Sequence, residues 1–168
     1  MLDKDLLCAT DLTAAADQAV RAAVLTAERI GAQVTLLHVL MKAERTAEGK
    51  DRVLDAMHAQ AAKGKGNDKI TYKLLDGDFM KVIAEETRHE HSLLVLGTHG
   101  PQGIRQKLFG ADILKLVRHS AIPALVVQEG TPTDQFLERI VLPVAAHSQI
   151  DRLLDLVCAL AKAFASEV

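Results

Sequence analysis

The sequence predicts an α/β protein built on a doubly wound, five-stranded parallel sheet. Apolar runs alternate with helical patterns along the chain, and most of these runs are apolar throughout, as strands covered on both faces should be. In addition, a loop with Gly97, Gly100, Gly103 and Gly110 joins one apolar run to a helical pattern. A strand, a glycine loop and a helix in succession can present backbone N–H groups to a bound anion.

Five short apolar runs predict the strands. They are residues 6–10, 34–40, 70–75, 93–96 and 124–127. The third run alternates between apolar and polar residues, whereas the others are almost continuously apolar.

Four segments between these runs have apolar residues at helical spacing. They are residues 14–30, 51–63, 79–89 and 110–119. Gly31 is a suitable stop for the first helix, and Asp78 is a suitable N-cap for the third. Residues 41–50 are predicted to form a polar connection.

We expect the strand order 3-2-1-4-5 with right-handed crossovers. In a doubly wound sheet, the point where the winding reverses leaves a crevice at the carboxyl ends of the strands. Here that crevice would lie between the first and fourth strands, with Asp11 at one lip and Gly97 at the other.

The C-terminal part repeats the start of the chain. Residues 140–144 have the apolar pattern of residues 6–10, and Asp151 then takes the position of Asp17. We therefore expect a domain over residues 1–130, followed by a linker and a partial second repeat over residues 131–168. That repeat would contain one strand, 140–144, and one helix, 150–165, which cannot bury their apolar face alone.

Composition narrows the classes of function. The net charge is −2 and the chain has four Phe, one Tyr and no Trp, which argues against a nucleic-acid partner. No leader-like N-terminus or membrane-length apolar run is present, so we expect a cytoplasmic protein without a membrane partner. Cys8 and Cys158 lie in apolar runs and are expected to be buried, reduced thiols.

Two other kinds of site are not expected. His89 and His91 are close in sequence but lack a third ligand at a recognisable spacing, so no metal site is predicted. No serine or cysteine nucleophile with an orienting acid is evident either, so we expect a protein that is not an enzyme.

The glycines and the strand ends together resemble the universal stress protein family. Gly97, Gly100 and Gly110 are separated by two and nine residues, Asp11 follows the first strand, and His38 and Val39 close the second. The resemblance extends over residues 4–128. It implies a Rossmann-like fold of the adenine nucleotide alpha hydrolase-like type.

The resemblance also implies a site for ATP, ADP or AMP. Its residues would be Thr10, Asp11, Val39, Gly97, His99, Gly100, Gly110 and Ala111. Asp11 and the Val39 backbone would meet the adenosine end, Gly97 and Gly100 the ribose and phosphates, and Gly110 with Ala111 the terminal phosphates. His99 would shape the loop or line the ligand. The alternatives are a ligand-free glycine connection and an Asp11 that only caps the first helix.

The sequence departs from the family pattern at the phosphate end. The family usually has Ser or Thr after the last glycine, where this chain has Ala111 and then Asp112. The lost hydroxyl is worth about 1.5–3 kcal/mol for a hydrogen bond to a charged group. A carboxylate about 4 Å from a phosphate would add about 1 kcal/mol of repulsion in water and about 4 kcal/mol at intermediate dielectric. Arg105 and Lys107 would offset part of this repulsion.

Two functions follow from this departure. The first is a stress-response regulator that binds an adenine nucleotide weakly, and the second is a nucleotide-free interaction module whose phosphate site Asp112 fills. The family has no common reaction, and an ATPase is the least expected outcome. Members commonly form dimers through the fifth strand, so we expect a homodimer through that edge, the C-terminal strand and helix, or both.

Overall fold

The computed structural model describes residues 2, 4–64, 69–98, 110–133, 135–143 and 150–168. Its core is a five-stranded sheet in which every neighbouring pair of strands is parallel. The strands are β1 (Asp5–Ala9), β2 (Val34–Leu40), β3 (Ile70–Asp76), β4 (His91–Thr98) and β5 (Ala124–Gln128). Their order is β3-β2-β1-β4-β5, which confirms the predicted order 3-2-1-4-5.

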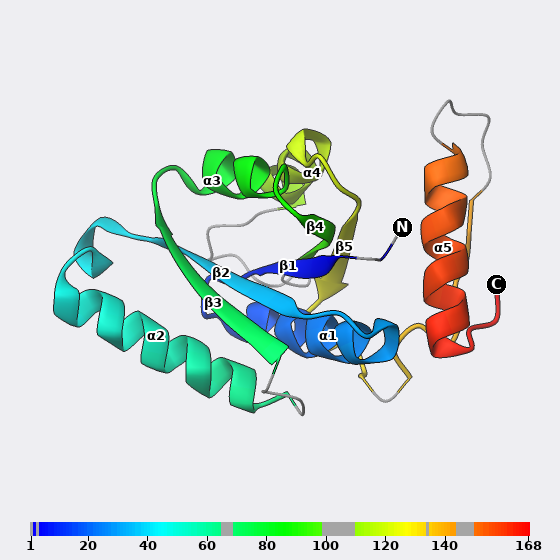
Figure 1. The fold of residues 1–168 in the computed structure, drawn as a ribbon, viewed down its shortest axis with the longest axis horizontal. Coiled ribbons are helices and arrows are strands. Elements are labelled where there is room, and N and C mark those ends of the chain that lie inside the picture. The colour runs from blue at the N-terminus through cyan, green and yellow to red at the C-terminus, as the bar shows by residue number, and fades with distance from the viewer. Residues whose placement is uncertain (1, 3, 65–68, 99–109, 134, 144–149) are drawn as a thin grey trace.

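Helices cover both faces of this sheet (Figure 1). They are α1 (Ala14–Ile30), α2 (Ala47–Ala62), α3 (Phe79–Glu86), α4 (Gly110–His119) and α5 (Ile150–Phe164), with a short 3₁₀ helix η1 (Lys42–Glu44). α1 and α2 lie on one face, and α3 and α4 on the other (Figure 1). Each face has its own cluster of buried apolar side chains, so the predicted doubly wound architecture is confirmed.

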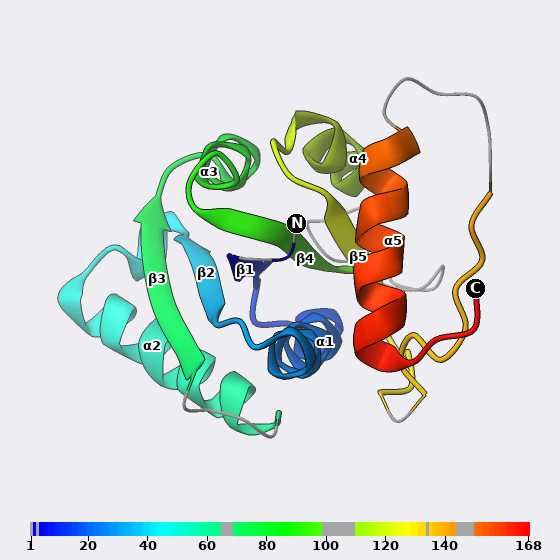
Figure 2. The same ribbon diagram turned by 45° about the vertical axis from the view of Figure 1, so that its right-hand side comes forward.

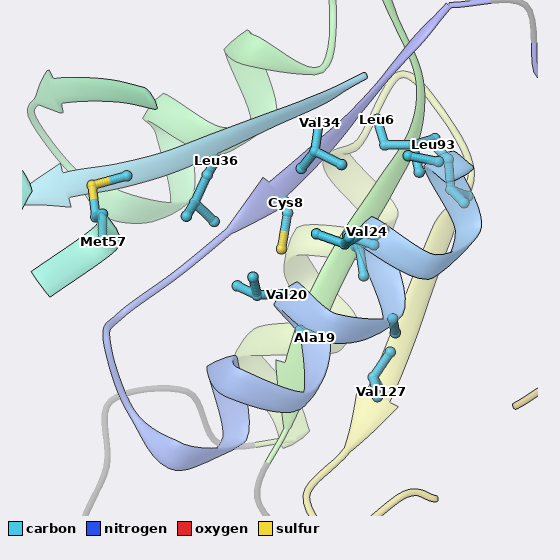
Figure 3. Close-up of a cluster of buried hydrophobic side chains, with 14 of the residues drawn as sticks. Leu6, Cys8, Ala19, Val20, Val24, Val34, Leu36, Met57, Leu93 and Val127 are labelled. Atoms are coloured by element: carbon cyan, nitrogen blue, oxygen red, sulfur yellow. The ribbon is translucent and has the colours of Figure 1, made fainter. Parts of the chain in front are cut away.

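The end of α1 and the start of α3 have the capping residues that the sequence predicted. Gly31 ends α1 in the left-handed conformation, with φ of 74°, and the Asp78 carboxylate accepts a 3.1 Å hydrogen bond from the Lys81 N–H. α1 packs closely on the sheet because its buried face is rich in alanine. Figure 3 shows Val20 and Val24 directed at the strand residue Cys8.

The two cysteines have different environments. Cys8 is buried, and burial raises the pKa of its thiol to about 12, which agrees with the predicted inert thiol. Cys158 is exposed, so the prediction that it is buried was wrong. The reason is that α5 contacts the core with only one side, and Cys158 lies on the other.

α2 begins about one turn earlier than predicted. Residues 41–50 were expected to be a polar connection, but they contain η1 and the first turn of α2. The Thr46 hydroxyl accepts a 3.1 Å hydrogen bond from the Gly49 N–H and caps the helix there. α3 in turn ends at Glu86, three residues before the predicted end at His89.

The predicted strand over residues 140–144 was wrong. Residues 140–143 have no strand structure, Val141 is 84% exposed, and Val144 lies outside the described residues. A strand needs a ladder of hydrogen bonds to a neighbour, and here the described residues form only one isolated bridge, between Arg139 and Glu167. An apolar pattern alone therefore did not make a strand.

The predicted C-terminal helix is present as α5. It packs beside α1, on the β5 side of the sheet (Figure 2). Leu156 and Leu160 join the same buried cluster as α1, and the Phe164 ring meets Phe136 edge to face, with centroids 5.7 Å apart. α5 thus buries part of its apolar face against the α1 cluster, while Leu153 and Leu154 stay exposed. The origin of residues 131–168 as a partial second repeat stays a prediction.

Candidate functional site

A cavity of about 710 Å³ lies at the carboxyl ends of β1 and β2. Its lining comes from the β1–α1 turn, the end of β2, η1 and its flanking residues, the turn before α3, and the starts of α3 and α4. The described lining residues are Thr10, Asp11, Thr13, His38, Val39, Leu40, Met41, Lys42, Arg45, Gly77, Phe79, Met80 and Asp112. Of the predicted site residues, the structure therefore brings Thr10, Asp11 and Val39 together.

The backbone of Val39 extends past the end of the neighbouring strand. β1 ends at Ala9, and its last hydrogen bond to β2 runs from the Thr10 N–H to the Leu37 carbonyl, at 2.9 Å. Alternate residues of a strand direct their N–H and C=O groups to the same side. Because the Leu37 carbonyl faces β1, the N–H and C=O of Val39 face the space beyond the end of β1, at the cavity.

Asp11 organises the start of α1. One of its carboxylate oxygens accepts hydrogen bonds from the Thr13 N–H at 3.1 Å and from the Thr13 hydroxyl at 2.5 Å. Thr13 is the N-cap, since its hydroxyl accepts from the Ala16 N–H at 3.4 Å. Asp11 thus supports the cap residue without being the cap, and it lines the cavity as well.

A buried polar network fixes the floor of the cavity. The Thr10 hydroxyl donates to the Gln60 side-chain oxygen at 2.6 Å, and the Gln60 amide donates to Asp17 at 2.7 Å. Sequence reasoning missed Gln60, although it is the one polar residue at helical spacing with Val53 and Met57 on the buried face of α2. A polar residue in that position was the available signal.

His38 connects the end of β1 to η1 and is 4% exposed. Its Nδ1 lies 2.9 Å from the Thr10 carbonyl oxygen, and its Nε2 lies 3.1 Å from a carboxylate oxygen of Glu44. The same Glu44 oxygen accepts a 2.7 Å hydrogen bond from the Met41 N–H. These contacts hold η1 as one wall of the cavity. The sequence had marked His38 only as part of a strand-end motif.

Charges of both signs line the cavity. Lys42 and Arg45 contribute cations from the η1 side, and the Arg45 Nε also pairs with Asp76 at 3.0 Å. Asp112 contributes a carboxylate from the first turn of α4, and Lys115 lies 3.5 Å from it. The carboxylate that the sequence placed at the phosphate end is therefore a lining group of this cavity.

The glycines are only partly described. A Cβ on Gly97 would lie 2.5 Å from the Ala15 carbonyl oxygen, so close packing of β4 on α1 explains this glycine. Gly97 is not among the described residues that line the cavity, and its contact with a ligand stays a prediction. Gly110 and Ala111 are the first residues of α4.

The remaining loop predictions fall outside the described residues. They concern His99, Gly100, Gly103, Arg105 and Lys107. For these residues the sequence-based expectations stand as they were.

Two further observations concern metals and membranes. In the described parts of the chain, no three His, Cys, Asp or Glu side chains are grouped so as to hold a metal ion. His91 instead contacts the buried Glu86 carboxylate at 3.2 Å. None of the described helices has the length and apolar character needed to span a membrane.

The fold and the cavity together define a class of protein. This is a doubly wound α/β domain with a ligand-sized cavity at the carboxyl ends of its central strands, where such folds bind ligands. The sequence model of the universal stress protein family matches residues 4–128, and the chain belongs to this family. The resemblance inferred from the sequence is thus confirmed.

Solved structures of the family have the same fold. The universal stress protein UspA from Lactobacillus plantarum is 18% identical, with a TM-score of 0.55, over 74% of this chain and 97% of that one. A universal stress protein in complex with cAMP is 18% identical, with a TM-score of 0.59, over 76% and 98%.

A third structure also includes the C-terminal segment in the match. A universal stress protein from Archaeoglobus fulgidus is 16% identical, with a TM-score of 0.73, over 98% of this chain and 65% of that one. A search among curated protein sequences gave no match.

Proposed function

We propose that this chain is a cytoplasmic stress-response regulator that binds an adenine nucleotide weakly in the cavity at the ends of β1 and β2. The observation that carries the proposal is the convergence of Asp11 and Val39. The family resemblance implied an adenosine site at these two residues, and both line one cavity although Asp11 follows β1 and Val39 belongs to β2. The related structure in complex with cAMP supports an adenine nucleotide as the ligand class.

The lining suits a nucleoside. The N–H and C=O of Val39 form a donor and acceptor pair that can meet the polar edge of an adenine ring. Leu40, Phe79 and Met80 provide apolar surface for the faces of the base. The Asp11 carboxylate accepts hydrogen bonds and can therefore take those of the ribose hydroxyls.

The phosphate end favours ligands with few charges. Asp112 lines the cavity, so each added phosphate brings more negative charge toward a carboxylate. We therefore expect AMP to bind at least as well as ADP, and ATP to bind most weakly. The Asp112 position also favours the second candidate, a nucleotide-free interaction module in which this carboxylate takes the place of a phosphate.

Isothermal titration with AMP, ADP and ATP tests the first proposal. Heat of binding with AMP is expected. An absence of heat with all three, in protein shown to be folded by circular dichroism, would leave the nucleotide-free module as the function.

A double variant tests the account of the phosphate end. Ala111→Ser with Asp112→Val should strengthen ATP binding, because it restores a hydroxyl donor and removes a carboxylate. The single change Asp112→Asn keeps the side-chain shape and removes only the charge, so it separates the effect of the carboxylate charge from that of the added hydroxyl. Unchanged or weaker ATP affinity in the double variant would refute this account.

We propose binding without a characteristic reaction. The described lining residues include neither serine nor cysteine, which supports a binding role. Incubation with ATP and measurement of released phosphate tests this, and turnover that is lost in Asp11→Asn would contradict it.

We also propose that the chain forms a homodimer. β5 is one of the two edge strands of the sheet, and exposed apolar side chains lie on it, on α4 and on α5. They are Leu114, Val126, Leu153 and Leu154. Light scattering at micromolar concentration should give twice the chain mass, and the pair of changes Leu153→Lys and Leu154→Lys should reduce it. A monomeric wild-type protein would contradict the proposal.

A further inference from the structure

Both ring nitrogens of His38 face hydrogen-bond acceptors. Nδ1 lies 2.9 Å from the carbonyl oxygen of Thr10, and Nε2 lies 3.1 Å from a carboxylate oxygen of Glu44. A carbonyl oxygen only accepts, and so does an ionised carboxylate. A neutral imidazole has one N–H and can satisfy only one of these partners, so both hydrogen bonds require the imidazolium form.

The Glu44 carboxylate is held in a way that fits its ionised form. The oxygen that faces His38 also accepts a 2.7 Å hydrogen bond from the Met41 N–H. An oxygen that already accepts the Met41 N–H is suited to accept a second hydrogen bond from the ring, as expected of a carboxylate. The extra proton therefore belongs on His38.

This contact joins the two sides of the ligand cavity. Thr10 precedes Asp11 at the end of β1. Glu44 belongs to η1, and Lys42 of η1 and the following residue Arg45 both line the cavity. His38 also lines the cavity and is almost completely buried. Its protonation state is therefore placed to decide whether the η1 wall stays fastened to the end of β1.

We propose that His38 is a positioning residue whose imidazolium form fastens η1 to β1, so that ligand affinity falls as the ring loses its proton. Without the proton, a lone pair of the ring faces either the Thr10 carbonyl or the Glu44 carboxylate. The wall that carries Met41, Lys42 and Arg45 then loses a contact that helps to fasten it to the end of β1. The part of this proposal that concerns affinity rests on the proposed function.

The other charged groups near the cavity are arranged around this contact. Asp11 and Asp112 line the cavity with negative charge, and Lys42 and Arg45 with positive charge. On the side of α1 and α2, Asp17 is already paired with Lys63 at 2.7 Å. Among the described residues, Glu44 is thus the acidic group within hydrogen-bond distance of the ring.

Nuclear magnetic resonance of the ring nitrogens tests the proposal without any ligand. In ¹⁵N-labelled protein at pH 6, both His38 nitrogens are expected to carry a proton and to lose one as pH rises, with His38→Gln used for assignment. The protection of the amides of residues 41–45 against hydrogen exchange, relative to the base-catalysed intrinsic rate at each pH, should fall over the same range in wild type. In His38→Gln this protection should not depend on pH. A ring with one proton at pH 6, or the same pH dependence of protection in the variant, would overturn the proposal.

AMP titrations between about pH 5.5 and 8.5 test the consequence for binding. Wild-type affinity should be highest at the acid end and fall by up to about tenfold per pH unit above the titration of the ring. His38→Gln should give a flat profile. The matched control His58→Gln, which changes an exposed histidine of α2 outside the cavity lining, should keep the wild-type profile.

The two kinds of measurement separate the two proposals. If AMP does not bind at any pH, the proposed function fails, and the resonance and exchange data alone decide the role of His38. If AMP binds with the same pH profile in wild type and His38→Gln, the role of His38 fails while nucleotide binding stands.

Discussion

The hydroxyl of Thr10 donates a 2.6 Å hydrogen bond to the side-chain oxygen of Gln60, and both groups are buried. This contact ties the end of the central strand β1 to the outer helix α2. Gln60 extends the connection, because its amide donates to Asp17 at 2.7 Å and Asp17 pairs with Lys63. The floor of the ligand cavity is thus held by α2 as well as by the sheet.

Removal of this amide should destabilise the fold. Gln60→Ala leaves the Thr10 hydroxyl buried without its acceptor, which should lower the free energy of unfolding by about 1–3 kcal/mol. Urea unfolding measures this loss. Asp55→Ala, at an exposed position of the same helix, is the control and should change stability by less than about 0.5 kcal/mol. Equal effects of the two changes would show that the network contributes little.

Gly97 should resist replacement for a packing reason. In Gly97→Ala the new Cβ would lie 2.5 Å from the Ala15 carbonyl oxygen, so β4 and α1 must move apart, at a cost of about 1–3 kcal/mol. Gly64→Ala is a suitable control because its Cβ meets its nearest atom at 3.4 Å. Thermal unfolding of both variants checks the difference. A fully stable Gly97→Ala protein would instead favour a ligand contact as the reason for this glycine.

The buried Glu86 should make the free energy of unfolding depend on pH in the acidic range. Burial alone would raise the pKa of its carboxyl, but hydrogen bonds and charges from Lys73 and His91 outweigh this and hold the pKa below its ordinary value of 4.5. A group with a lowered pKa in the folded state stabilises the protein above its unfolded pKa and loses that effect as pH falls. The unfolding free energy of wild type should therefore fall below about pH 4.5.

A pair of variants isolates this effect. Glu86→Gln should be less stable than wild type at neutral pH and show a shallower loss below about pH 4.5, measured by urea unfolding at several pH values. Glu90→Gln, at an exposed glutamate, should follow the wild-type curve. A Glu86→Gln curve parallel to wild type at every pH would mean that the pKa of Glu86 does not change on folding.

α5 should contribute to the stability of the whole domain through one face. Leu156→Ala removes a side chain that is 7% exposed and belongs to the α1 cluster, so it should cost about 2–5 kcal/mol. Leu153→Ala, at a leucine of the same helix that is 42% exposed, should cost much less. The free energy of unfolding of both variants is measured by urea unfolding followed by circular dichroism. Similarly small losses of unfolding free energy in both variants would indicate that α5 does not pack on the core of the domain.

Much of the fold follows from patterns that are local in the sequence. Four almost continuously apolar runs and one alternating run identified the five strands, and helical spacing identified α1, α3, α4 and α5 to within a few residues of their observed bounds. These patterns are informative because a strand covered on both faces and an amphipathic helix must each be apolar where they are buried. The error at the start of α2 arose because the Thr46 cap lies in a polar segment.

The sequence by itself indicated the family and led to the expected sheet order 3-2-1-4-5, both of which are confirmed, since strand ends and glycine spacing are typical of the place where such a sheet opens. The adenosine-end roles of Asp11 and Val39 stay predictions. Only the tertiary structure decided that Gln60 and His38 both meet Thr10, because these contacts join residues 50 and 28 positions apart in the chain. It also decided that residues 140–143 form no strand, since a strand exists only where a neighbouring strand completes its hydrogen bonds.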